Sequence, residues 1–227
     1  MGHRRGGIDR TVAAPVDGAP GAGALISLSA TAVVPGRPFT AVEHSVADLR
    51  VMDQMLVRLR RHVAEVVAPS RAASRDDRVT DPDGSQLKIV MPYVRAALEP
   101  RDLVAVGFFG QARMDIDHAP IVGLEAALIA DVSGESGLLV YENLFWPGVG
   151  WGNLVLFDGW TSKDRWGRDD PRHVESIRRS PAHYHSIRLH NGVVPGGLPG
   201  DAGVRLVRTR YLDFSGDRPW RAIRELG

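Results

Sequence analysis

The chain has 227 residues, a formal net charge of +1 at pH 7 and no cysteine. The missing thiols exclude a disulfide framework, a thiolate metal site and a cysteine nucleophile. The near balance of basic and acidic residues does not indicate a nucleic-acid footprint, and no apolar run reaches the roughly 20 residues of a membrane span. These features predict a globular, cytoplasmic protein with no nucleic acid and no membrane among its partners.

The first 23 residues differ in composition from the rest of the chain. They are rich in alanine, glycine and proline and contain no compact apolar segment. We therefore expect a disordered lead over 1–23 rather than a secretion signal. Hydrophobic residues make up 44% of the whole chain, which is enough for a buried core, and we predict a single α+β domain over 24–227.

Two periodic segments open this domain. Residues 24–34 alternate apolar and small polar side chains at a period of two and predict a strand. Apolar residues from Leu49 to Val66 recur at spacings of three and four and predict a helix. A helix packed on its own sheet explains this stripe better than a coiled-coil partner surface.

The middle of the chain predicts a loop, two strands and a helix. Residues 70–85 are polar and predict a loop. Residues 86–94 predict an edge or bulged strand because Pro92 cannot donate a backbone hydrogen bond. The continuous apolar run over 103–109 predicts a buried strand, and a helix is expected over 120–133.

The C-terminal half predicts a hairpin, a helix in two pieces, two strands and a short helix. Ser162 is a good N-cap, and Pro171 interrupts the helical pattern that follows it. The predicted ranges are 138–145 and 153–157 for the hairpin, 162–167 and 171–179 for the helical pieces, 183–190 and 204–214 for the strands, and 219–226 for the terminal helix.

The elements predicted over 103–190 follow the order strand, helix, strand, strand, helix, strand. This is the ferredoxin-like βαββαβ arrangement, in which both helices cover one face of a four-stranded sheet. Residues 24–100 together with 204–227 suggest a second, incomplete unit of the same kind. Since two bare apolar sheet faces can close against each other, we predict an α/β barrel formed within the chain or by dimerisation, and we expect a homo-oligomer.

Three features around Trp160 carry a resemblance to a known group. Trp160 ends a strand, Ser162 caps the helix after it, and Asp170-Pro171-Arg172-His173 lies within that helix. This pattern resembles the second half of dimeric α/β-barrel proteins and covers less than half of the chain. The group includes antibiotic-biosynthesis monooxygenases, haem-degrading monooxygenases and chlorite-dismutase-like haem proteins. The resemblance implies an apolar barrel cavity, a small apolar or aromatic substrate and monooxygenase-like chemistry.

Haem is the cofactor that this resemblance implies, and its binding needs a neutral imidazole over an apolar pocket. In haem-binding members of the group a histidine of the second helix ligates the iron, and His173 best matches that position. His183 is the other candidate ligand, and Trp160 and Phe157 are the candidate walls of the pocket. We expect no other cofactor.

A reaction without a cofactor would need a base, an oxyanion donor and a dry cavity. The candidate bases are His185 and His118. The candidate oxyanion donors are Asn153 and Arg188.

Strand periodicity sorts the last histidines. His183 and His185 are expected on one face of their strand, and Arg188 and His190 on the other. The first pair could bind a metal with a third ligand such as Glu142. Hydrogen bonding at the start of a strand is the preferred interpretation, and we assign no metal site.

We predict a small-molecule enzyme that uses an apolar barrel cavity for oxidoreductase or monooxygenase-like chemistry, with a haem-dependent version among the options. The alternative is a non-catalytic ligand-binding or oligomeric assembly protein, whose cavity is filled by its own aromatic side chains. No motif in the sequence identifies the substrate.

Overall fold

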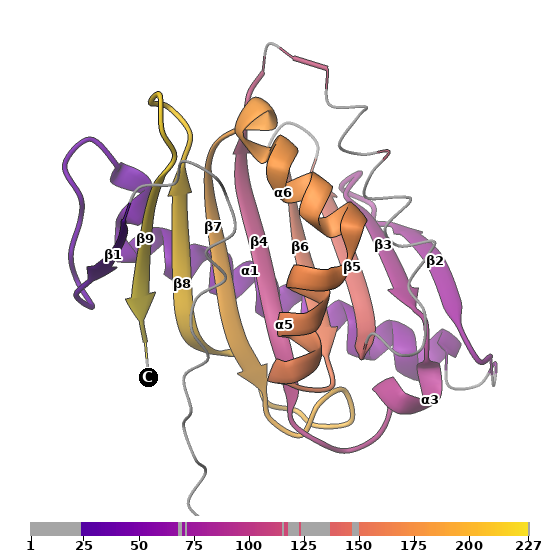
Figure 1. Ribbon diagram of the computed structural model, residues 1–227. Coiled ribbons are helices and arrows are strands. Elements are labelled where there is room, and N and C mark those ends of the chain that lie inside the picture. Colours follow the sequence, from indigo (N-terminus) through magenta and orange to yellow (C-terminus); the bar gives the residue numbers. More distant parts are fainter. Residues whose placement is uncertain are drawn as a thin grey trace, which may run out of the picture.

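The computed structural model describes residues 24–67, 70, 72–114, 116–117, 123, 137–146 and 150–226. A nine-stranded sheet runs through them in the order β1-β9-β8-β7-β4-β6-β5-β3-β2. Figure 1 shows helix α1 behind this sheet and helices α5 and α6 in front of it. The sheet is therefore the middle of three layers.

Neighbouring strands are antiparallel, except for β1 and β9 at one edge, which are parallel. The strands are β1 (Leu25–Leu28), β2 (Arg75–Thr80), β3 (Gln86–Met91), β4 (Leu103–Ala112), β5 (Leu138–Trp146), β6 (Gly150–Phe157), β7 (Tyr184–Val194), β8 (Arg205–Asp213) and β9 (Trp220–Glu225). The helical elements are η1 (Pro38–Thr40), α1 (Val42–His62), η2 (Val63–Val67), α3 (Val94–Ala97), α5 (Trp160–Asp169) and α6 (Pro171–His183).

The predicted ferredoxin-like α/β barrel is wrong. Strands β7, β4, β6 and β5 lie side by side in that order. The sheet continues beyond this group on both sides, because β8 pairs with β7 and β3 pairs with β5. The edge hydrogen bonds that would close a barrel are used to extend an open sheet. Helix α1, and not a second sheet, covers the face opposite α5 and α6, so the predicted barrel cavity does not form among the described strands.

The larger core lies between α1 and the sheet. Met52, Met55 and Leu59 of α1 are fully buried, and they belong to one apolar cluster with Leu103 of β4 and Leu154 of β6. The stripe of spacings three and four in the sequence is thus the face of α1 that packs on the sheet. A smaller cluster lies on the other face, where Trp166 of α5 packs against residues that include Val155 and Phe157 of β6.

Two local predictions fail because strand pairing overrides local composition. Residues 75–80, predicted as part of a loop, form edge strand β2, which pairs with β3 along its whole length. Residues 220–225, predicted as part of a terminal helix, form β9, which pairs with β8 and β1. The lead over 1–23 lies outside the described residues, and so does the helix predicted over 120–133, apart from Gly123.

The register of the β7–β8 pair shifts between Asn191 and Gly192, where Val207 of β8 is the extra residue, and the backbone of β8 comes close to Gly192. A Cβ atom on Gly192 would lie 2.6 Å from the carbonyl oxygen of Arg205. We expect Gly192→Ala to lower the free energy of unfolding by about 1–3 kcal/mol, because a backbone atom must move. Urea unfolding measures this. Gly167→Ala in α5, where a Cβ atom meets nothing within 4 Å, is the control, and equal losses in the two variants would contradict the expectation.

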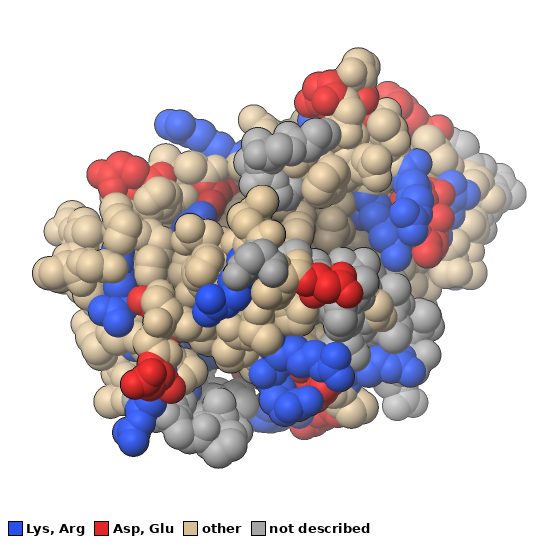
Figure 2. Space-filling model, turned by 90° about the horizontal axis from the view of Figure 1, so that it is seen from above, with Lys and Arg blue, Asp and Glu red and all other residues tan. Residues whose placement is uncertain are grey.

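None of the described helices is both long enough and apolar enough to cross a membrane. In Figure 2, which views the molecule from above, basic and acidic side chains are interspersed with uncharged ones. The described residues on that face therefore do not form one continuous patch of positive or negative charge.

Candidate functional site

A buried polar network lies between α1 and the sheet. Arg188 on β7 donates to both carboxylate oxygens of Asp48 on α1, over 2.5 and 2.9 Å. The Nε2 atom of His190 lies 2.8 Å from Asp48 Oδ2, and its Nδ1 atom lies 2.8 Å from Thr209 Oγ1 on β8. Burial alone would raise the pKa of Asp48, but the hydrogen bonds and charges of Arg188 and His190 lower it below its usual value.

A second group of buried polar contacts lies nearer the edge of the sheet, around Arg224 of β9, which is fully buried. Its guanidinium donates to the hydroxyl of Tyr211 and to the backbone carbonyls of Ser29, Ala32 and Thr40. This arrangement holds the segment between β1 and α1 against the sheet.

The order Asp48, His190, Thr209 is that of a catalytic triad, but the geometry is closed to a substrate. His190 and Thr209 are both 0% exposed, so a substrate has no access to the hydroxyl of Thr209. A nucleophile must reach its substrate, so this network is structural. Its role is to fix α1 on β7 and β8.

Glu142 of β5 is a second buried carboxyl group on the α1 face, in very different surroundings. It is 0% exposed, and neither of its oxygens has a hydrogen-bond partner among the described residues. Its cross-strand neighbours are Ile89 and Leu154. Burial raises the pKa of Glu142 well above its usual value, and the positive charge of Arg58 on α1 only partly opposes this. Glu142 therefore stays protonated at pH values that ionise an ordinary glutamate.

A hollow of about 90 Å³ lies between the end of α1 and the β2–β3 hairpin, and Glu142 is not part of its wall. Leu87 in its wall lies diagonally across the β3–β5 pair from Glu142, a separation of roughly 7–8 Å in ordinary sheets. Arg58 is in the wall as well. The complete lining consists of Arg58, Arg61, His62, Glu65, Val79, Asp81 and Leu87.

His62 in the wall of the hollow forms a dyad with Asp77 of β2. The distance from His62 Nε2 to Asp77 Oδ2 is 2.8 Å, and Arg75 donates to both oxygens of the same carboxylate, over 2.9 and 2.7 Å. Burial would raise the pKa of Asp77, but the bonds from Arg75 and His62 lower it, so the carboxylate stays ionised and orients the imidazole. The second ring nitrogen of His62 has no bond to a described residue and is available for proton transfer.

Two arginines of α1 supply positive charge to the same hollow. Arg58 Nη2 lies 3.1 Å from Asp81 Oδ2, whereas its Nη1 is buried and has no hydrogen-bond partner among the described residues. Arg61 is exposed, and no described acidic residue pairs with it. The hollow thus combines an oriented imidazole with guanidinium donors that can hold an anionic group.

The predicted bases and oxyanion donors do not come together. Arg188 is bound to Asp48 on the α1 face, whereas Asn153 lies on the opposite face and donates to the hydroxyl of Tyr141. His185 is a half-buried residue of β7. His118 lies outside the described residues. The predicted pairing of Arg188 and His190 on one strand face is correct, since both contact Asp48.

The four residues predicted to hold haem do not surround a common space. His173 and His183 lie on α6 about 15 Å apart along the helix axis. His173 stacks on Trp166 with ring centroids 4.0 Å apart, Phe157 is fully buried against the same indole, and the half-exposed Trp160 lies beside Lys163.

Burial, with a smaller effect from the charge of Lys163, lowers the pKa of His173 to about 4, although the charge of Asp170 opposes the shift. The imidazole is therefore neutral at pH 7, as a metal ligand must be. Its stacked position nevertheless does not fit an iron ligand above an open pocket. Within the described ranges, no group of three or more histidine, aspartate and glutamate side chains is placed to hold a metal ion.

Sequence reasoning missed His62, Asp77 and Arg58. His62 falls at the end of the predicted helix and Asp77 inside the predicted loop, so no local pattern joined them. The sequence RDDRVT over 75–80 has no alternation of apolar and polar residues, and the alternation of exposure that places Asp77 and Val79 on one side of β2 is seen only in the structure. The sequence indicates Glu142 only as a possible third metal ligand.

Searches of protein-family models, of curated proteins and of solved structures found no match to this chain.

Proposed function

We propose that the protein is a small-molecule enzyme in which His62 acts as a general base on a substrate bound in the hollow by Arg58 and Arg61. The observation that carries the proposal is the 2.8 Å contact between His62 and Asp77 in the wall of that hollow. The partly buried carboxylate of Asp77 orients the imidazole and stabilises the imidazolium that forms when it accepts a proton. The chemistry is therefore proton abstraction.

The lining of the hollow defines the class of substrate. Two arginines favour an anionic group, and Val79 and Leu87 provide an apolar wall beside it. A volume of about 90 Å³ is well below the roughly 300–1,000 Å³ of pockets for drug-sized ligands. We infer a small carboxylic acid with an acidic C–H bond next to the carboxylate. The oxidoreductase and monooxygenase activities expected from the sequence stay predictions, since no described residue bears on them.

Glu142 has a positioning role in this proposal. While it is protonated, it leaves the charge of Arg58 available to the substrate. Once ionised, it competes for that guanidinium. The other charged groups of the hollow are Arg61, Glu65 and Asp81, and all three lie closer to solvent. Substrate affinity should therefore fall as pH rises through the raised pKa of Glu142, and Glu142→Gln should remove this pH dependence.

The test is exchange of substrate protons for deuterium. Small 2-hydroxy acids and 2-amino acids, which have a C–H bond next to the carboxylate, are incubated with the protein in D₂O and followed by proton NMR. We expect exchange at the carbon next to the carboxylate in at least one acid, and a loss of about 10²–10⁴-fold in rate for His62→Gln. His44→Gln, at an exposed histidine of the same helix, is the matched control and should keep the wild-type rate. No exchange in any acid, or an unchanged rate in His62→Gln, would contradict the proposal.

A non-catalytic ligand-binding protein is the second candidate, and the small size of the hollow favours it. In the same samples, a ligand-binding protein would bind one of the acids without exchanging its protons for deuterium. Thermal stabilisation by one of the acids, lost in Arg58→Gln and retained in His62→Gln, would identify this case.

A further inference from the structure

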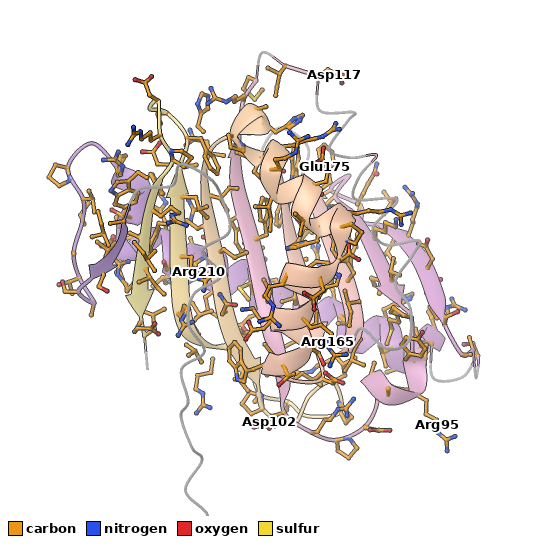
Figure 3. The ribbon with its side chains drawn as sticks, viewed as in Figure 1. Arg95, Asp102, Asp117, Arg165, Glu175 and Arg210 are labelled. Carbon is orange, nitrogen blue, oxygen red and sulfur yellow. The ribbon has the colours of Figure 1, made fainter. Side chains whose placement is uncertain are left out.

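A second group of polar residues lies on the opposite face of the sheet, where α5 packs. His190 and Thr209 point toward α1, as their contacts with Asp48 and with each other show. Side chains alternate along a strand, so Asn191, Arg208 and Arg210 point to the α5 side. Figure 3 shows Arg210 on β8 on the same side of the sheet as the helices α5 and α6.

Asn191 is the unusual member of this group. It is 1% exposed, and neither its amide nitrogen nor its amide oxygen has a hydrogen-bond partner among the described residues. Its partner across the β7–β8 pair is Arg208. Buried amides in folded proteins are almost always hydrogen-bonded, so this one indicates a polar group that comes from outside the described chain.

Lys163 in the first turn of α5 completes the group. Its Nζ atom lies 2.8 Å from Asp164 Oδ1 and 5.9 Å from the centre of the Trp160 ring. Burial lowers the pKa of Lys163, Asp164 partly offsets this, and the charges of Arg210 and Arg208 lower it further. The ammonium group is therefore within electrostatic range of both guanidinium groups.

We propose that Lys163, Asn191, Arg208 and Arg210 bind a phosphate group between α5 and strands β7 and β8. Three cations face this space, against the carboxylates of Asp164 and of Glu225, whose Oε1 atom lies 3.0 Å from Arg208 Nε. A phosphate dianion has enough acceptor oxygens for an ammonium, two guanidinium groups and an amide at once, whereas a carboxylate has only two oxygens. This site is independent of the function proposed for His62, since it lies on the other face of the sheet.

Isothermal titration calorimetry with inorganic phosphate tests the proposal, with sodium chloride of equal ionic strength as the reference. We expect phosphate to bind the wild-type protein and Kd to rise at least about tenfold in Lys163→Met and in Arg208→Gln, as loss of one charge-assisted contact implies. Asn191→Leu should also weaken binding, and it should not unfold the protein because the amide bonds to no described group. The circular dichroism spectrum of each variant verifies the fold.

Two controls separate this site from the rest of the protein. Lys88→Met removes the only other lysine, on β3, and should bind phosphate as the wild type does. Arg58→Gln should also keep phosphate binding, which distinguishes this site from the hollow near His62. Equal phosphate affinity in wild type and Lys163→Met, or no effect beyond that of chloride, would overturn the proposal.

Glycerol 3-phosphate in a parallel titration identifies the source of the phosphate group. Tighter binding than inorganic phosphate supports a phosphorylated small molecule. Equal binding supports free phosphate as the ligand. Loss of both in Lys163→Met is expected in either case.

Discussion

Asp48→Ala is expected to lower the free energy of unfolding by about 3–5 kcal/mol, the usual cost of removing one partner from a buried ion pair. The variant leaves Arg188 with an uncompensated charge and His190 with an unused ring nitrogen, both under α1. Asp48 is only 8% exposed, so water cannot replace the lost carboxylate without opening the packing of α1 on the sheet. Urea unfolding at pH 7, followed by circular dichroism, measures the loss.

Asp76→Ala is the matched control for this prediction. Asp76 is exposed on edge strand β2, and its replacement should change the free energy of unfolding by no more than about 0.5 kcal/mol. The lowered pKa of Asp48 also gives a pH signature: its contribution is fully present above the pKa of an unfolded aspartate and is lost as pH falls through the lowered folded-state pKa. Similar unfolding curves for Asp48→Ala and Asp76→Ala would show that the network does not hold α1.

Glu142→Met is expected to have the opposite effect and to raise the free energy of unfolding at pH 8 by about 1–3 kcal/mol, the cost of an unsatisfied buried polar group. Methionine has a similar unbranched shape, and the surroundings include Ile89 and Leu154. A substitution that stabilises the protein while removing the proposed influence on Arg58 would mark Glu142 as a residue kept for function.

The pH dependence of Glu142 has the reverse sign from that of Asp48. Its folded-state pKa is raised, so the wild-type protein is most stable below the pKa of an unfolded glutamate, and stability falls as pH rises through the raised value. The stability difference between Glu142→Met and wild type should therefore widen with pH. Glu99→Met, at an exposed glutamate, should show no such trend. Destabilisation of Glu142→Met at every pH would instead indicate that the carboxyl group has a stabilising partner.

Some features of this protein follow from the sequence alone. The stripe from Leu49 to Val66 predicted a helix, because only a helix brings residues three and four apart to one face. The helix forms, and its apolar side packs on the sheet. Alternation in β7 likewise predicted that Arg188 and His190 share one face, and this is correct because both contact Asp48.

Only the tertiary structure decided the shape of the sheet and the composition of the sites. The segments 75–80 and 220–225 became strands because neighbouring strands satisfied their backbone hydrogen bonds: β2 pairs with β3, the next strand along the chain, and β9 pairs with β8 and with the distant β1. The pairing of β8 with β7 and of β3 with β5 left the sheet open where the sequence predicted a barrel. Asp48 lies 140 residues from Arg188 and 142 from His190, and the charge of Arg58 acts on Glu142 from another layer of the fold. Periodicity determines which face a side chain occupies, but strand pairing and helix packing determine which residue lies opposite to it.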